Sequence, residues 1–120
     1  MRLFGKLRRS GAASIGPHEA KRLLAQGAVL LDVREPAEWA AGHAPEAVHV
    51  PLGQLLAGKA AVPADRRVVT VCRSGARSSR AAKYLSGQAV HVVNLRGGMT
   101  AWAAAGLPVV DGKGRSGTIA

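Results

Sequence analysis

Short apolar runs alternate with amphipathic helical segments along this sequence, and no other feature restricts the fold so strongly. We predict strands at 28–33, 48–50, 67–71 and 90–95. We predict helices at 17–26, 36–41, 78–86 and 100–105. Continuous apolar runs are typical of strands that a parallel sheet buries on both faces. The alternation therefore predicts an α/β domain with a mainly parallel central sheet flanked by helices.

The chain has the length of a single domain. Its 120 residues and 48% hydrophobic content suffice for one core. Glycine, proline and histidine interrupt the longer uncharged stretches, so we expect a soluble protein without a membrane-spanning helix. We divide the chain into a flexible basic arm at 1–13, a folded domain at 14–110 and a flexible Gly-rich tail at 111–120. The arm lacks the apolar centre of a secretion signal, and we expect a cytoplasmic location.

Positive charge is concentrated in one part of the chain. The formal net charge is +10, from 17 Lys and Arg against 7 Asp and Glu, and no acidic residue occurs between Asp65 and Asp111. One half of the domain should therefore carry a positive field that attracts anions, such as a small anionic substrate or an acidic partner protein. Sparse aromatic residues argue against a nucleic-acid partner. For the N-terminal arm we favour a solvated segment over contact with an anionic membrane surface.

Cys72 is the one cysteine of the chain, which excludes an internal disulfide and a multi-thiolate zinc site. It follows a predicted strand and precedes a loop with a glycine and two arginines, after which Ser78 is predicted to cap a helix. Loop amides, the helix N-terminus and the arginine charges favour a thiolate over a thiol. Converging amides can also bind an anion attached to the sulfur. The alternative is that Cys72 only ends the buried part of the strand.

Four segments of the sequence, taken together and in this order, resemble the rhodanese-like domain family of sulfurtransferases. They are LDVREPAEW at 31–39, Gly42 and His43 ahead of PEAVHVPL, CRSGARS at 72–78, and LRGGMTAWAAAGLPV at 95–109. The resemblance covers about 14–110 and implies a single-domain enzyme in which Cys72 becomes a persulfide. The Cys72 thiolate would take a sulfane sulfur from an anionic donor such as thiosulfate. A thiophilic acceptor, cyanide or a thiol, would then remove it.

The resemblance also implies roles for other residues, and no metal, nucleotide or flavin. The residues expected to bind the donor and the transferred sulfur are Arg73, Ser74, Gly75, Ala76 and Arg77. The residues expected to support the site from outside it are Asp32, Arg34 and Ser78. We expect His43 to tie loops together and Trp39 and Trp102 to anchor the core. Gly97 and Gly98 should meet a backbone requirement.

Two positions depart from the family pattern. Glu46 stands where the family commonly has a glycine, which brings a positive φ at this position into question. Ser74 stands where the larger two-domain thiosulfate enzymes carry a basic residue. Sulfur transfer is therefore better supported than thiosulfate as the donor.

Two other functions stay open on the sequence alone. Cysteine phosphatases also combine a cysteine, a loop and an arginine, but their signature places five residues between the two, whereas four separate Cys72 from Arg77. The loop is thus one residue too short for that class. The second alternative is a module that relays sulfur from a partner protein or only mediates contact, for which an acidic patch on the partner would suit the basic face.

Overall fold

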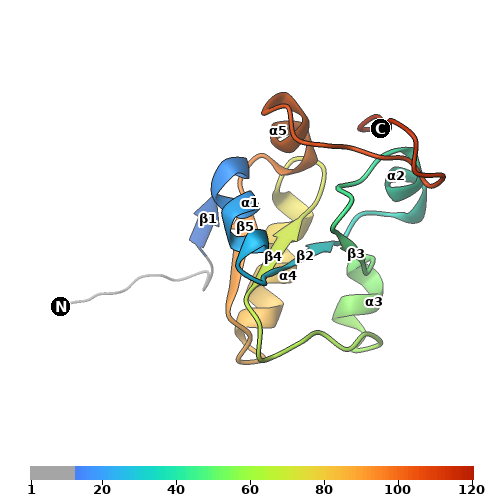
Figure 1. Cartoon of the computed structure of the whole chain (residues 1–120). Helices are drawn as coiled ribbons and strands as arrows, with labels where there is room; N and C mark the ends of the chain where they lie inside the picture. The colour runs from blue at the N-terminus through green and yellow to red at the C-terminus, as the bar shows by residue number, and fades with distance from the viewer. Residues whose placement is uncertain (1–12) are drawn as a thin grey trace.

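A five-stranded sheet forms the centre of the computed structural model, which describes residues 13–120 (Figure 1). Its strands are β1 (Ala13–Ile15), β2 (Val29–Asp32), β3 (Val48–His49), β4 (Val68–Val71) and β5 (Val92–Leu95). They lie in the order β1-β5-β4-β2-β3, and every pairing is parallel. The predicted α/β class with a parallel sheet flanked by helices is confirmed.

Four helices connect these strands within residues 13–120, and a fifth follows the last strand. They are α1 (Pro17–Ala25), α2 (Pro36–Ala41), α3 (Leu52–Leu56), α4 (Ala76–Ser86) and α5 (Gly98–Ala104). A proline at the first position starts both α1 and α2, since its fixed φ suits a helix and its missing N–H has no helical partner there. In the same part of the chain, no helix is long and apolar enough to cross a membrane.

The sheet buries one hydrophobic cluster on each of its faces. The cluster beside α1 and α5 includes Ile15, Ala20, Leu30, Val69, Val71, Leu95, Met99 and Trp102. The cluster beside α3 and α4 includes Leu31, Leu52, Leu55, Val68, Cys72, Ala81 and Leu85. Figure 1 shows α1 and α4 on opposite sides of the sheet. Successive residues of β4 point to opposite faces, so the strand delivers Cys72 to the face that α4 covers.

The predicted boundaries agree with the structure at most elements, and three differences are informative. The helix α2 has its predicted bounds, whereas β1 and α3 are absent from the prediction. Both are short, and β1 buries one of its three residues, so neither leaves a periodic pattern. The prediction that Ser78 caps α4 is wrong, because the helix begins at Ala76 with Gly75 as its N-cap. At Gly75 a φ of 122° turns the chain into the helix earlier than a non-glycine residue would allow.

The C-terminal segment runs back to α2 after leaving α5 (Figure 1). The Thr118 amide donates to the Ala41 carbonyl at 3.0 Å, and the His43 amide donates to the Val110 carbonyl at 2.8 Å. Gly42 permits this approach, since a Cβ there would lie 2.3 Å from the Thr118 carbonyl oxygen. The segment thereby packs beside α2.

The three-part division of the chain stays a prediction. The basic arm, apart from Ala13 in β1, lies outside the described residues. The segment 111–120 makes the contacts given above, and its mobility is not tested by them. Glu46 does not have a positive φ, because Ala89 is the non-glycine residue with a positive φ among residues 13–120. Glu46 instead forms an exposed ion pair with Lys21.

Candidate active site

Cys72 lies directly after β4, at the carboxyl edge of the parallel sheet, where ligands of such folds bind. Three residues, 73–75, separate it from the start of α4. Its sulfur accepts hydrogen bonds from the Gly75 amide at 3.0 Å and from the Ser78 hydroxyl at 3.3 Å. The residue is 1% exposed. The chain therefore bends tightly around one buried sulfur atom.

The surroundings of Cys72 favour its charged form. Burial acts to raise the pKa of the thiol. Hydrogen bonds from the Ser78 hydroxyl and from the amides of Ser78, Gly75 and Ser74 outweigh this effect, and the pKa falls below its ordinary value. The direction agrees with the thiolate expected from the sequence, but the hydrogen bonds around the sulfur, rather than the arginines, are its main cause.

The loop is anchored from the opposite side by the start of α5. The Met99 amide donates to the Cys72 carbonyl at 2.8 Å, and the Thr100 amide donates to the Arg73 carbonyl at 3.1 Å. Gly98 makes this approach possible, because a Cβ there would lie 2.4 Å from the Cys72 carbonyl oxygen and its φ is +60°. Gly97 has a φ of +80°. The expected backbone requirement at these two glycines is confirmed.

Two polar side chains of the sheet hold the start of α4, and sequence reasoning missed both. The Asn94 amide donates to the Gly75 carbonyl at 3.3 Å, and the Thr70 hydroxyl donates to the Ser78 carbonyl at 2.9 Å. The Thr70 hydroxyl also lies 3.2 Å from Asn94 Oδ1, and both residues are buried. The available signal was a polar residue within each of two apolar strands, since buried polar groups need partners.

Arg77 lies in the first turn of α4 and forms a bidentate ion pair with Glu38 on α2. The two N···O distances are 2.6 and 2.8 Å. The hydrogen bond from Arg77 lowers the pKa of Glu38 from its ordinary 4.5 to about 2, against the opposing effect of burial. Glu38 in turn raises the pKa of Arg77 further above its ordinary value. Glu38 was missed as a site residue, although its place in the first turn after Pro36 marks a capping box.

The other predicted loop residues are more exposed. The Arg73 Nε donates to the Ala120 carbonyl at 2.8 Å. Ser74 and Ala76 are exposed, and the Ser74 amide contributes to lowering the pKa of Cys72. The structure thus brings the backbone amides of Ser74, Gly75 and Ser78 to the sulfur, while the two arginines have other partners.

Asp32 and Arg34 form a fully buried ion pair at the end of β2. Arg34 Nη2 lies 2.7 Å from Asp32 Oδ2 and also donates to the Gly42 carbonyl at 2.7 Å, and Nη1 donates to the Glu38 carbonyl at 3.4 Å. These bonds fix the position of α2. The buried pair is thus connected through Glu38 and Arg77 to the loop at 72–77, the cysteine loop.

Aromatic rings form a stack beside α2. Trp39 is half-buried and stacks on the imidazoles of His43 and His49, with ring centroids 3.6 and 4.7 Å apart. His43 Nδ1 lies 2.7 Å from the Trp39 carbonyl oxygen, which fits the expected role in tying loops together. Trp102 is fully buried in the core as predicted. The prediction that Trp39 anchors the core is wrong, because its ring stacks on the two histidines and belongs to neither hydrophobic cluster.

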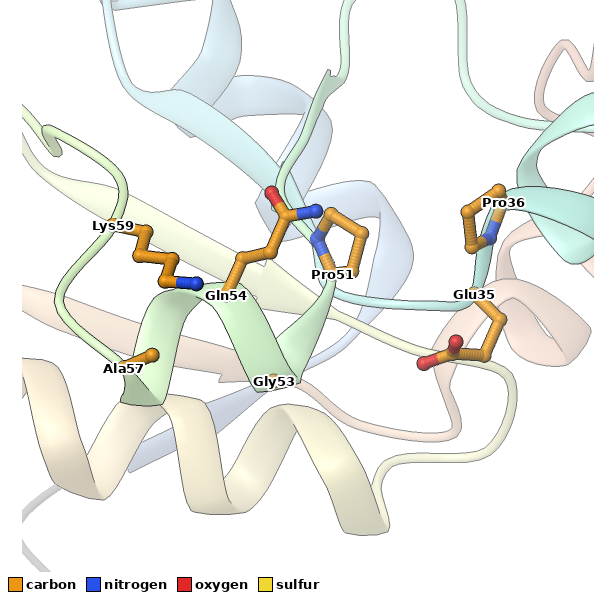
Figure 2. Close-up of a pocket in the computed structure, with 7 residues that line it drawn as sticks. All are labelled: Glu35, Pro36, Pro51, Gly53, Gln54, Ala57 and Lys59. Carbon is orange, nitrogen blue, oxygen red and sulfur yellow. The ribbon is translucent and has the colours of Figure 1, made fainter.

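A pocket of about 340 Å³ opens between the start of α2 and the exposed side of α3 (Figure 2). The residues lining it are Glu35, Pro36, Pro51, Gly53, Gln54, Ala57 and Lys59. Figure 2 shows Glu35 and Pro36 across the pocket from the α3 residues. Glu35, which lines the pocket, also interacts electrostatically with Arg77. Within residues 13–120, no group of three or more His, Cys, Asp or Glu side chains is arranged to hold a metal ion.

Comparisons with known proteins agree with this architecture. The family model of the rhodanese-like domain matches residues 16–105. A protein of Allochromatium vinosum named sulfurtransferase is 47% identical over 87 residues, which cover 72% of this chain and 81% of that protein. A thiosulfate sulfurtransferase of Pseudomonas syringae is 37% identical over 89 residues, covering 73% of this chain and 84% of that protein.

A solved structure shows the same fold. The rhodanese-related protein of Thermoplasma volcanium superimposes with a TM-score of 0.76 at 28% identity, covering 82% of this chain and 97% of that one. The family model spans most of the chain, and the matched segment contains Cys72, its loop and the glycines that approach it. The chain belongs to the rhodanese-like domain family.

Proposed function

We propose that the protein is a sulfurtransferase that carries a sulfane sulfur as a persulfide on Cys72. The observation that carries this proposal is the pair of hydrogen bonds from the Gly75 amide and the Ser78 hydroxyl to the Cys72 sulfur. They stabilise a thiolate, which is the nucleophilic form of cysteine. The same donors would stabilise the negative charge of a persulfide. The family and the relatives named as sulfurtransferases support the same reaction class.

The proposed reaction consists of two displacements. In the first, Cys72 Sγ attacks the outer sulfur of thiosulfate, the S–S bond of the donor breaks, and its electron pair leaves with sulfite. In the second, cyanide or a thiolate attacks the terminal sulfur of the persulfide, and the electron pair of that S–S bond returns to Cys72 Sγ. With cyanide the product is thiocyanate. Neither step changes the number of electrons or protons, so each half-reaction balances without a cofactor.

Burial of the cysteine supports sulfur transfer over phosphate-ester hydrolysis. Cys72 is 1% exposed, and three residues form the turn before α4 begins. A terminal sulfur is a single atom and can enter such a turn. A phosphoryl group carries three oxygens that all need donors.

Steady-state assays separate these classes of reaction. We expect thiosulfate and cyanide to give thiocyanate, Cys72→Ser to abolish its formation, and neither protein to hydrolyse an aryl phosphate. Ser79→Ala changes an exposed side chain of the same helix turn and serves as the matched control with normal turnover. Hydrolysis of the aryl phosphate that depends on Cys72, without any thiocyanate from a panel of sulfur donors, would contradict the proposal. Persulfide formation only in the presence of a protein donor would instead favour a sulfur relay between proteins.

A further inference from the structure

We propose that Glu38 determines donor specificity: by neutralising Arg77 at the rim of the cysteine loop, it makes the site favour sulfur donors with one negative charge over donors with two. This inference rests on the proposed sulfur transfer and names the charge class of the donor. Glu38 acts through Arg77 and is a positioning residue.

The first step of the argument is the place of Arg77. It directly precedes Ser78, whose hydroxyl bonds the Cys72 sulfur, and it interacts electrostatically with Cys72. An unpaired guanidinium at this position would attract the second charge of a dianionic donor. Both of its terminal nitrogens are instead bound to the two oxygens of one carboxylate. The positive charge of Arg77, which the sequence analysis expected to bind the donor, is therefore already balanced by Glu38.

The second step is that Glu38 is held in place independently of Arg77. Its Oε1 accepts a hydrogen bond from the Glu35 amide at 2.9 Å, and its backbone carbonyl accepts one from Arg34 at 3.4 Å. The Glu38 side chain is 19% exposed and the Arg77 side chain is 34% exposed. A preorganised, half-buried and bidentate pair loses little entropy on forming and is screened less than an exposed pair.

The third step concerns the other charges near the rim. Four charged residues contact one another in sequence: Asp32, Arg34, Glu38 and Arg77. Their charges alternate in sign and sum to zero. Glu35 adds a further negative charge that acts on Arg77. The Arg73 Nε donates to the Ala120 carbonyl, and position 74 carries a neutral serine. A donor with one charge can use the amides around the sulfur, whereas the second charge of a dianion meets an Arg77 guanidinium that Glu38 already pairs.

Thiosulfate and methanethiosulfonate test this inference, because a methyl group of the second replaces one charged oxygen of the first. Both donate a terminal sulfur by the same step: Cys72 Sγ bonds to that sulfur, and the electron pair of the broken S–S bond leaves with sulfite or with methanesulfinate. The comparison therefore varies the charge of the donor while the attack on sulfur stays the same. The measured quantity is kcat/KM for each donor, with the ratio of the two as the readout.

The variant is Glu38→Gln, which keeps an oxygen for the Glu35 amide and removes the charge. We expect the ratio of kcat/KM for thiosulfate to that for methanethiosulfonate to rise about fivefold, mainly through a lower KM for thiosulfate. High salt should reduce this rise. The control is Glu46→Gln, which removes one carboxylate of an exposed pair with Lys21 and should leave the ratio unchanged.

An unchanged ratio in Glu38→Gln, or an equal change for both donors, would overturn the inference while leaving sulfur transfer intact. A rise of the same size in Glu46→Gln would also overturn it, because net charge rather than the Arg77 pair would then set the preference. If the wild-type protein forms no persulfide with either donor, the proposed function itself is wrong, and the inference falls with it.

Discussion

The Ser78 hydroxyl lies 3.3 Å from the Cys72 sulfur and 3.2 Å from the Gly75 carbonyl oxygen. Its single proton can serve either acceptor, and a thiolate is the stronger one because it is charged. Ser78 therefore supports the thiolate more directly than its predicted role outside the site implied. The arrangement follows from the start of α4 at Ala76, which turns the third helical residue toward the sulfur.

Replacing this hydroxyl should raise the pKa of Cys72. In Ser78→Ala we expect the thiolate to form at higher pH, so the rising limb of the activity profile moves to more alkaline pH. At pH values below this rising limb, the loss of a hydrogen bond to a charged group should lower turnover about tenfold or more. Ultraviolet absorbance of the thiolate during a pH titration measures the effect, with Ser79→Ala as control. Coincident titration curves for Ser78→Ala and the wild type would remove Ser78 from the site.

The close approach of Gly98 to the cysteine loop should not tolerate a side chain. Gly98→Ala would place a Cβ 2.4 Å from the Cys72 carbonyl and 2.5 Å from the Arg73 carbonyl, at a positive φ. We expect a loss of about 2 kcal/mol or more in the free energy of unfolding, together with reduced activity. Gly53→Ala is the matched control, because nothing lies within 4 Å of its Cβ, and it should stabilise α3 by about 0.5–1 kcal/mol. Urea unfolding measures both; equal effects would refute the account of Gly98.

Breaking the buried ion pair should cost much more than breaking an exposed one. In Asp32→Asn, Arg34 would stay fully buried without its counter-charge, and we expect a loss of about 3–5 kcal/mol in the free energy of unfolding. Glu46→Gln removes the carboxylate of an exposed pair and should change that free energy by about 1 kcal/mol or less. Denaturant titration of both variants checks the difference. Similar losses would mean that Asp32 does little to position α2.

The ion pair of Glu38 and Arg77 should make part of the stability depend on pH. The pKa of Glu38 is lowered from 4.5 to about 2, so its contribution is complete above about pH 4.5 and is lost as the pH falls toward 2. The difference in unfolding free energy between the wild type and Glu38→Gln should therefore be largest at about pH 6, where it is about 1 kcal/mol, and smaller at about pH 3. Urea unfolding at both pH values measures it. A difference that stays constant would show that the carboxylate is not stabilised by the pair.

The sequence sufficed for the parallel sheet because its strands are continuous apolar runs between helical segments. The β4 run VVTV is buried at every position, and the loop after it holds the predicted nucleophile. The short β1 and α3 could not be predicted, since three and five residues carry too little periodicity. Their places depend on pairing with β5 and packing beside α4, which are tertiary contacts.

The partners of the site residues were harder to predict than the residues themselves. Arg77 was expected to hold the donor anion, but Glu38 lies 39 positions away in sequence and binds both of its terminal nitrogens. Asn94 likewise reaches the Gly75 carbonyl from the neighbouring strand. Such contacts depend on strand order and on where helices begin, which local patterns do not encode. Gly98, in contrast, was identified because Gly97 and Gly98 resemble the paired glycine that the family carries before a helix, which implies a backbone requirement.

The persulfide on Cys72 is tested most directly by the intact mass of the protein after brief exposure to a sulfur donor. We predict that the wild-type protein gains the mass of one sulfur atom from thiosulfate or methanethiosulfonate and loses it again on addition of cyanide, with one thiocyanate released for each sulfur removed. Peptide mapping should place the added sulfur on Cys72, and Cys72→Ser should gain none. A wild-type mass that stays unchanged with every sulfur donor offered, including a protein persulfide, would contradict the account.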